Sequence, residues 1–229
     1  MATYVLIPGA GCDPWYWHPV AEDLQGRGHE VVAVDLPCED PSAGLDDYAD
    51  AVVDAVGDQA GVVLVAHSLG GFTALLVCAR IRVDLLVLLE AMIPAPGETL
   101  ADWWTATGHG RAYREQAERD GRTAGDLMDD FLHDVPPHLA AGLRARPREQ
   151  SDGPSHQPWP LDAWPDVPTR MLIGSEDRLF PVGFMRRVAR ERLGIVPDEI
   201  PAGHMPMLAR PAELAERLES YRAGLAVGG

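Results

Sequence analysis

Basic residues are scarce in this sequence of 229 residues. Arginine supplies all 19 of them, lysine is absent, and aspartate and glutamate together number 35. The formal charge of −16 repels phosphate backbones and anionic lipid headgroups. This charge balance argues against a nucleic acid or a membrane surface as partner, and it favours a neutral or cationic small molecule as ligand.

Cysteines and long apolar runs are also few. The three cysteines, Cys12, Cys38 and Cys78, are widely spaced and form no Cys-x-x-Cys pair, so neither a disulfide framework nor a zinc site is indicated. No apolar run approaches the ~18 residues that a membrane span requires. The amino terminus has no basic segment before its apolar residues and no cleavage pattern after them, which predicts a strand there and a cytoplasmic protein.

Short apolar runs bounded by turn residues are frequent, and they predict strands buried on both faces of a parallel sheet. They span residues 3–8, 30–37, 61–68, 83–92, 169–177 and 198–203. Apolar residues at helical spacing lie between them, most clearly at 45–56, at 184–189 and after Pro211. The alternation predicts an α/β domain: a mostly parallel sheet of about six strands, flanked by helices.

The alternation stops between residues 95 and 166, where proline, glycine, tryptophan and histidine are frequent and no strand is readable. A structureless loop of this length is uncommon in a compact domain. We therefore expect residues 1–94 and 167–229 to form the core, and residues 95–166 to form a helical cap. The four histidines of this segment have no ligand spacing on one helix face, so no metal site is predicted.

The stretch "VVLVAHSLGGF", residues 62–72, places Ser68 between a predicted strand and a predicted helix. Such a turn is sharp and needs small residues on both sides of the serine, which Ala66 and Gly70 provide. The pattern matches the nucleophile elbow G-x-S-x-G except that Ala66 replaces the first glycine. Ser68 is therefore a candidate nucleophile, and a helix-capping serine is the alternative.

A serine nucleophile requires a histidine base and a carboxylate that orients the base. Asp177 follows the predicted strand at 169–174 in "GSEDRLFP", and His204 follows the next strand in "GHMP". Because the carboxyl ends of parallel strands share one sheet edge, Ser68, Asp177 and His204 are expected to meet. The oxyanion of an acyl transfer needs donors as well, and the backbone N–H groups of Ala10 and Leu69 are the candidates.

These motifs resemble those of the α/β-hydrolases over nearly the whole chain. "IPGAGCDPWYW" resembles the oxyanion loop of the plant methylesterase and hydroxynitrile-lyase branch, with Pro8 where that branch usually has histidine. "AHSLGG", "GSEDRLFP" and "GHMP" resemble the elbow, acid and base segments, while the predicted sheet lacks the family's first two strands. The resemblance implies a serine esterase with a helical cap, a small-molecule ester as substrate and no cofactor.

Several further residues are candidates for the substrate pocket. Glu90 ends the predicted strand at 83–92 and is either a polar pocket group or an alternative triad acid. Trp15, Trp103, Trp104 and Met205 are the apolar candidates. Adjacent tryptophans on a helix cannot face the same way, so at most one of Trp103 and Trp104 is expected to line the pocket.

Three other functions remain open. A hydroxynitrile-lyase-like reaction could use Ser68 and His204, but that branch uses a lysine near the base and this chain has none. A catalytically silent ligand receptor could keep the same scaffold. A dinucleotide-binding enzyme is disfavoured because Pro14 stands where G-x-G-x-x-G requires its third glycine. Neither the ester nor the oligomeric state follows from the sequence.

Overall fold

The computed structural model of the chain describes residues 1–225. Six strands form one sheet in the order β2-β1-β3-β4-β5-β6, and all neighbouring strands are parallel. The strands are β1 (Thr3–Ile7), β2 (Glu30–Ala33), β3 (Val62–His67), β4 (Leu85–Leu89), β5 (Thr169–Gly174) and β6 (Asp198–Ile200). The predicted parallel α/β sheet is confirmed, although several strands end two to four residues earlier than the apolar runs suggest.

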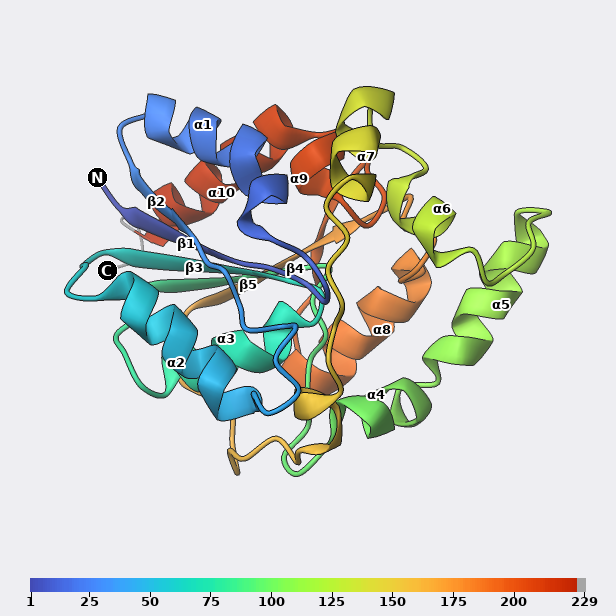
Figure 1. Cartoon of the computed structure of the whole chain (residues 1–229), viewed down its shortest axis with the longest axis horizontal. Coiled ribbons are helices and arrows are strands. Elements are labelled where there is room, and N and C mark those ends of the chain that lie inside the picture. The colour runs from blue at the N-terminus through green and yellow to red at the C-terminus, as the bar shows by residue number, and fades with distance from the viewer. Residues whose placement is uncertain (226–229) are drawn as a thin grey trace.

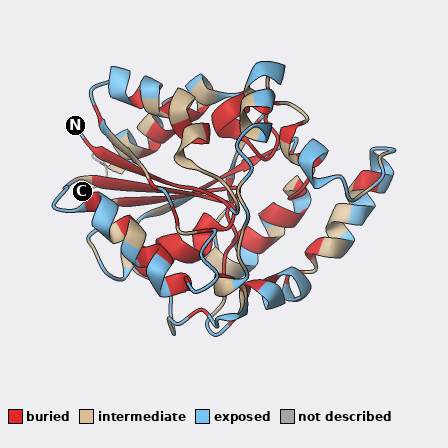
Figure 2. Cartoon of the chain, viewed as in Figure 1, coloured by how far each residue is buried: buried red, intermediate tan, exposed pale blue. Residues whose placement is uncertain are grey.

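Helices cover both faces of the sheet (Figure 1). One face carries α1 (His18–Gly26), α9 (Pro206–Ala209) and α10 (Pro211–Leu225), and the other carries α2 (Leu45–Val56), α3 (Gly70–Cys78) and α8 (Val182–Leu193). Successive strand side chains enter opposite cores: Val5 and Ile7 pack on the α2 and α3 side, whereas Tyr4 and Leu6 pack on the α1 and α10 side. The central strands β1, β3 and β4 are therefore fully buried, whereas the edge strand β2 is partly exposed (Figure 2).

The sequence signals for helix ends act locally as expected. At the start of α2, the Gly44 N–H donates to the Asp47 carboxylate at 2.7 Å, which satisfies one of the unpaired donors of the first turn. At the end of α8, Gly194 adopts a left-handed backbone with φ of 68°, a conformation that glycine reaches without steric cost. These local interactions determine where α2 begins and where α8 ends.

The segment between β4 and β5 is helical. It contains α4 (Leu100–Ala106), α5 (His109–Arg119), α6 (Leu127–Leu132), α7 (Pro137–Arg144) and the 3₁₀ turn η2 (Gly153–His156). These elements gather beyond the carboxyl ends of the strands (Figure 1). Arg192 of α8 forms an ion pair with Glu98 through two hydrogen bonds. Because Glu98 lies just before α4, this pair joins the start of the segment to the core. The segment thus lies over the edge where the predicted site residues are found.

Across residues 1–225, none of the helices is both long enough and apolar enough to traverse a lipid bilayer.

Candidate active site

The turn between β3 and α3 holds Ser68 in a left-handed backbone conformation, with φ of 52°. This conformation is costly for a residue with a side chain and is retained where the surroundings enforce it. Two glycines make the turn possible. A Cβ at Gly70 would lie 2.8 Å from the Pro8 carbonyl oxygen, and one at Gly71 would collide with the Met92 carbonyl oxygen. The Ser68 hydroxyl is consequently presented at the carboxyl edge of the sheet.

Two loops from later strands bring their polar side chains to Ser68. The His204 Nε2 atom lies 3.1 Å from the Ser68 Oγ, and the His204 Nδ1 atom lies 2.7 Å from the Asp177 Oδ2. The other oxygen of Asp177 accepts hydrogen bonds from the backbone N–H groups of Leu179 and Phe180, at 2.7 and 2.9 Å. Asp177 and His204 are completely buried and Ser68 is 8% exposed. The three predicted residues therefore form one hydrogen-bonded series shielded from water.

Backbone donors lie beside the serine. In the loop after β1, the Gly9 N–H donates to the Tyr16 hydroxyl and the Gly11 N–H donates to the Gln150 side chain. Among the hydrogen bonds of residues 1–225, none uses the N–H of Ala10 or of Leu69. Both residues line the same cavity as Ser68. Leu69 also caps α3, whose N-terminal dipole attracts negative charge. The backbone N–H groups of Ala10 and Leu69 are therefore unengaged in residues that border the same cavity as Ser68.

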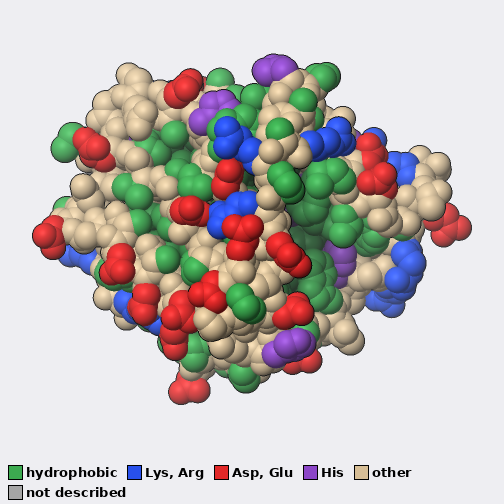
Figure 3. Space-filling model, viewed as in Figure 1, with side chains coloured by type: hydrophobic (Ala, Val, Ile, Leu, Met, Phe, Trp, Pro, Cys, Tyr) green, Lys and Arg blue, Asp and Glu red, His purple; other side chains and the backbone are tan. Residues whose placement is uncertain are grey.

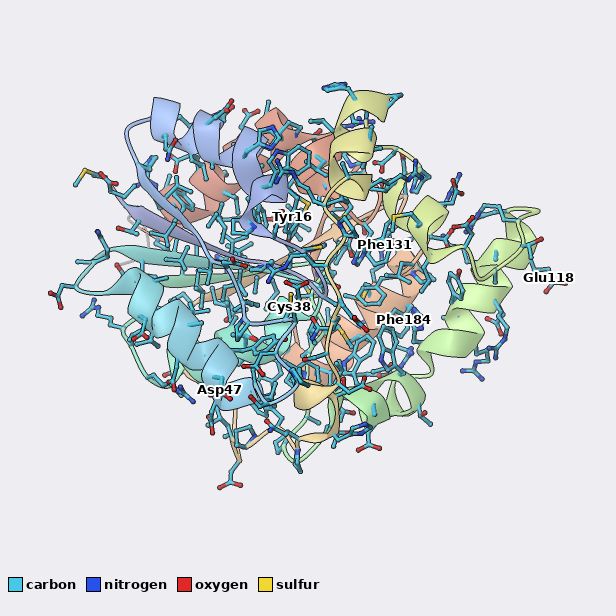
Figure 4. The ribbon with its side chains drawn as sticks, in the orientation of Figure 1. Tyr16, Cys38, Asp47, Glu118, Phe131 and Phe184 are labelled. Carbon is cyan, nitrogen blue, oxygen red and sulfur yellow. The ribbon has the colours of Figure 1, made fainter. Side chains whose placement is uncertain are left out.

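His67 connects the loop after β1 to the loop that carries His204. Its Nε2–H donates to the His204 carbonyl oxygen at 2.9 Å, and its Nδ1 accepts from the hydroxyl of Tyr16 at 3.2 Å. Tyr16 belongs to the 3₁₀ turn η1 (Pro14–Trp17) and is labelled in Figure 4. Complete burial, together with the neighbouring His204, holds the pKa of His67 well below its ordinary value. His67 is thus a neutral residue that links the two loops by hydrogen bonds.

A cavity of about 440 Å³ opens at Ser68, and its walls are almost entirely apolar. Figure 3 shows a hollow lined mainly by hydrophobic side chains on this face of the molecule. Phe131 of α6 lies beyond the strand ends, on the side of the cap (Figure 4). The residues that line the cavity are Ala10, Ser68, Leu69, Met92, Leu100, Trp104, His109, Leu127, Phe131, Gln150 and Leu179. A second cavity, of about 360 Å³, shares Ala10, Phe131 and Gln150 with the first.

The sequence matches the alpha/beta hydrolase family over residues 4–217. The chain belongs to the α/β-hydrolase family. It is 25% identical to methylesterase 7 of Arabidopsis thaliana over 94% of both chains, and 22% identical to norfluorocurarine synthase 1 of a Strychnos species over 94% of this chain and 93% of that one.

Solved structures show the same fold. A pyrethroid hydrolase from Sphingobium faniae superposes with a TM-score of 0.79 at 24% identity and covers 99% of both chains. Polyneuridine aldehyde esterase superposes with a TM-score of 0.76 at 21% identity, over 96% of this chain and 98% of that chain. The resemblance to the plant methylesterase-like branch is therefore supported by the sequence relatives, and the structural neighbours share the fold.

Three residues expected in the pocket of this α/β-hydrolase lie elsewhere. Trp103 is completely buried, and its indole N–H donates to the Ile93 carbonyl oxygen at 3.0 Å. Trp15 packs against Gly142 of α7, and the guanidinium of Arg146, just after that helix, lies 5.1 Å from its ring; Trp15 lines neither cavity. Trp104 lines the main cavity, and Met205 lines the second one. Only one of the adjacent tryptophans faces the pocket because the other fills the interface between α4 and the core.

Glu90 is the third residue that lies outside the pocket. It is completely buried and lines neither cavity. One oxygen or nitrogen atom from each of Glu90, Asp177 and His204 lies within 4.8 Å of the others, a spacing that a metal ion also allows. The polar atoms of Asp177 and His204 are, however, all engaged in the series described above. This arrangement fits a catalytic series better than a metal centre.

No sequence motif marks most of the residues in the cavity wall. Phe131, Leu179, His109 and Gln150 line the cavity, yet each comes from a loop or short helix without a motif. His109 is the first residue of α5 and is buried in this wall. Its Nε2–H donates to the Leu179 carbonyl oxygen at 2.8 Å, and burial lowers its pKa, so its ring is neutral in the cavity wall.

Proposed function

We propose that this chain is a serine hydrolase that cleaves carboxylic esters of small, uncharged, partly apolar compounds. One observation carries the proposal: Ser68, His204 and Asp177 form a buried hydrogen-bonded series that ends in an apolar cavity, beside the unengaged N–H groups of Ala10 and Leu69. This is the set of groups that acyl transfer through a serine requires.

The geometry supports a two-step reaction. His204 Nε2 accepts the proton of the Ser68 hydroxyl while Oγ attacks the ester carbonyl carbon. The carbonyl oxygen becomes negative and is stabilised by the N–H groups of Ala10 and Leu69. His204 then donates its proton to the departing alcohol, and the acyl group remains on Ser68. A water molecule, deprotonated by His204, then attacks the acyl carbon. The bond to Ser68 Oγ breaks, His204 returns the proton to Oγ, and the acid leaves. Asp177 holds the His204 ring and stabilises its charged form.

The cavity supports the choice of substrate. Its walls offer aromatic and aliphatic side chains, and the two polar side chains besides Ser68 are the neutral His109 and Gln150. A chain with a formal charge of −16 also repels anionic substrates. Some relatives are named as methylesterases, and one structural neighbour as a pyrethroid hydrolase. These names agree with an ester that has an apolar part.

A covalent probe tests the proposal. A fluorophosphonate should add one probe molecule per chain at Ser68, detected by intact-mass spectrometry and peptide mapping. The Ser68→Ala variant should lose both labelling and ester turnover. Ser175→Ala is the matched control, because Ser175 is exposed in the loop after β5 and should not affect labelling. An adduct at another residue, or no turnover in a panel of short-chain, long-chain, methyl and lactone esters, would contradict the proposal.

A second candidate is a different reaction at the same Ser68 and His204. Relatives named norfluorocurarine synthases match 94% of the chain, which favours this alternative. Hydroxynitrile cleavage is the less favoured form because the chain has no lysine. Probe labelling of Ser68 without turnover of any ester would support this candidate over the esterase.

A further inference from the structure

Glu90 directly follows β4, the strand between β3 and β5. The neighbouring strands carry Ser68 and Asp177 at or just beyond their carboxyl ends. Glu90 therefore lies at the same sheet edge as the candidate triad. It has neither the solvent contact nor the cavity surface that would let it touch a substrate.

The backbone of Glu90 is strained. Among residues 1–225, Ser68 and Glu90 are the two non-glycine residues with positive φ, at 52° and 46°. The Glu90 N–H donates to the Leu172 carbonyl oxygen at 3.0 Å, and its side-chain Oε1 accepts from the Gly174 N–H. A Cβ at position 174 would collide with the backbone carbonyl oxygen of Ala202 and would lie 2.5 Å from that Oε1, so glycine is required there. The local structure directs this carboxyl group toward the loop of Asp177.

The second oxygen of Glu90 has no partner. Oε2 is buried and makes no hydrogen bond within the described residues, and Glu90 forms no ion pair there. Burial, followed by the negative charge of Asp177, raises the pKa of Glu90 well above its ordinary value of 4.5. A carboxyl group that keeps its proton has a donor, whereas an ionised one would place two negative charges side by side without water.

We propose that Glu90 is a positioning residue: its carboxyl group carries a proton on Oε2 and donates it in a hydrogen bond to the Asp177 carboxylate. This hydrogen bond, together with the N–H groups of Leu179 and Phe180, holds the carboxylate toward His204 Nδ1. The positioning role rests on the proposed function, because it matters only if His204 acts as a base. The presence of the proton does not depend on that function.

The pH dependence of stability tests for the proton without any substrate. Between the ordinary carboxyl pKa and the raised one, the folded chain binds one more proton at residue 90 than the unfolded chain, so its free energy of unfolding falls as pH rises. The Glu90→Gln side chain does not titrate, so the free energy of unfolding of this variant lacks this decrease. The melting temperature of the wild type should therefore fall relative to that of Glu90→Gln as the pH rises above about pH 4.

The other groups that titrate nearby are present in both proteins. Asp177 and His204 face Glu90 directly, and His67 of β3 and His109 of α5 lie around them. Their contributions largely cancel in the difference between wild type and Glu90→Gln. A difference in melting temperature that stays constant over this pH range would overturn the proposal, because Glu90 would then ionise as an ordinary carboxyl group.

Kinetics of two variants of similar size test the positioning role. The Glu90→Gln amide can still donate to Asp177 and accept from Gly174 N–H, so it should keep kcat within about threefold. Glu90→Met has no donor and should lower kcat on the order of 10-fold with little change in KM. The low-pH limb of its kcat/KM profile should also move to higher pH, since an Asp177 carboxylate with one donor fewer attracts the protonated His204 more strongly.

The fraction of each variant that the fluorophosphonate labels at Ser68 measures how much of the protein is folded and competent. Each rate is divided by that fraction. Equal losses in Glu90→Gln and Glu90→Met, or wild-type rates and pH profile in Glu90→Met, would overturn the positioning role. If the wild type neither labels nor turns over esters, the proposed function fails, and the pH dependence of melting still decides whether Glu90 carries the proton.

Discussion

The sheet edge and the cap build opposite sides of the candidate site in different ways. At the sheet edge, Asp177 and His204 are completely buried. Two backbone N–H groups hold the Asp177 carboxylate, and the His204 carbonyl oxygen accepts a hydrogen bond from His67. In the cap, Trp104 and Leu127 line the cavity but remain 37% and 52% exposed. These two side chains contribute apolar surface, whereas hydrogen bonds fix His109 and Gln150 in the same wall. The sheet edge is therefore suited to fixed chemistry, and the cap is suited to setting the size of the substrate.

The largest effect should come from breaking the sheet edge at Asp177. In Asp177→Asn the amide oxygen keeps the N–H groups of Leu179 and Phe180, so the amide NH2 faces His204 Nδ1 and donates to it. This selects the wrong tautomer of the His204 ring and leaves its charged form without a carboxylate, so we expect kcat to fall by about 10³ to 10⁴. Steady-state kinetics on the best ester of the panel measures the loss. Glu90→Gln serves as the comparison and should cost far less. The reverse order would make Glu90 the triad acid.

A smaller effect should follow from removing the hydrogen bonds by which Tyr16 connects the loop after β1 to His67. Tyr16→Phe leaves the Gly9 N–H and the His67 Nδ1 without a partner. We expect the free energy of unfolding to fall by about 1 to 3 kcal/mol and kcat to fall as the loop that carries Ala10 loosens. Denaturant titration and kinetics measure the two effects.

Tyr113→Phe is the matched control for that variant. The Tyr113 hydroxyl donates to Asp130 and accepts from the Gly125 N–H within the cap, away from the loop after β1. The same chemical change there should leave kcat close to that of the wild type. Equal effects on kcat in both variants would contradict the prediction, because the Tyr16 hydroxyl would then have no specific role in positioning the residues of the sheet edge.

The smallest effect on the chemistry should come from the cap, where the paired tryptophans sharpen the comparison. Trp104→Ala enlarges the cavity and should shift preference toward longer esters, measured as kcat/KM across a chain-length series, with little change in stability. Trp103→Ala removes a buried ring and should lower the free energy of unfolding by about 3 to 5 kcal/mol while leaving that preference unchanged. A wild-type ester profile in Trp104→Ala would exclude the cap from substrate selection.

Much of the sheet edge could be predicted because its signals are local. Ser68 is marked by the small residues that its turn requires, and Asp177 and His204 follow apolar runs that form neighbouring strands. Once the strands are parallel, their carboxyl ends must share an edge, so the meeting of these residues follows from the order of the elements. The sequence alone thus determined the fold class, the sheet and which loops carry the candidate series.

Only the tertiary structure decided which side chains surround that series. Trp103 and Trp104 are indistinguishable in composition, and their separate places depend on how α4 packs against the core. The strand ends and the left-handed backbone of Glu90 likewise depend on the packing around them. The hydrogen bond between Tyr16 and His67 joins segments far apart in the chain. Such features depend on the relative positions of several elements, and no local residue pattern encodes those positions. For this reason the cap wall and the surroundings of Asp177 were beyond prediction from the sequence.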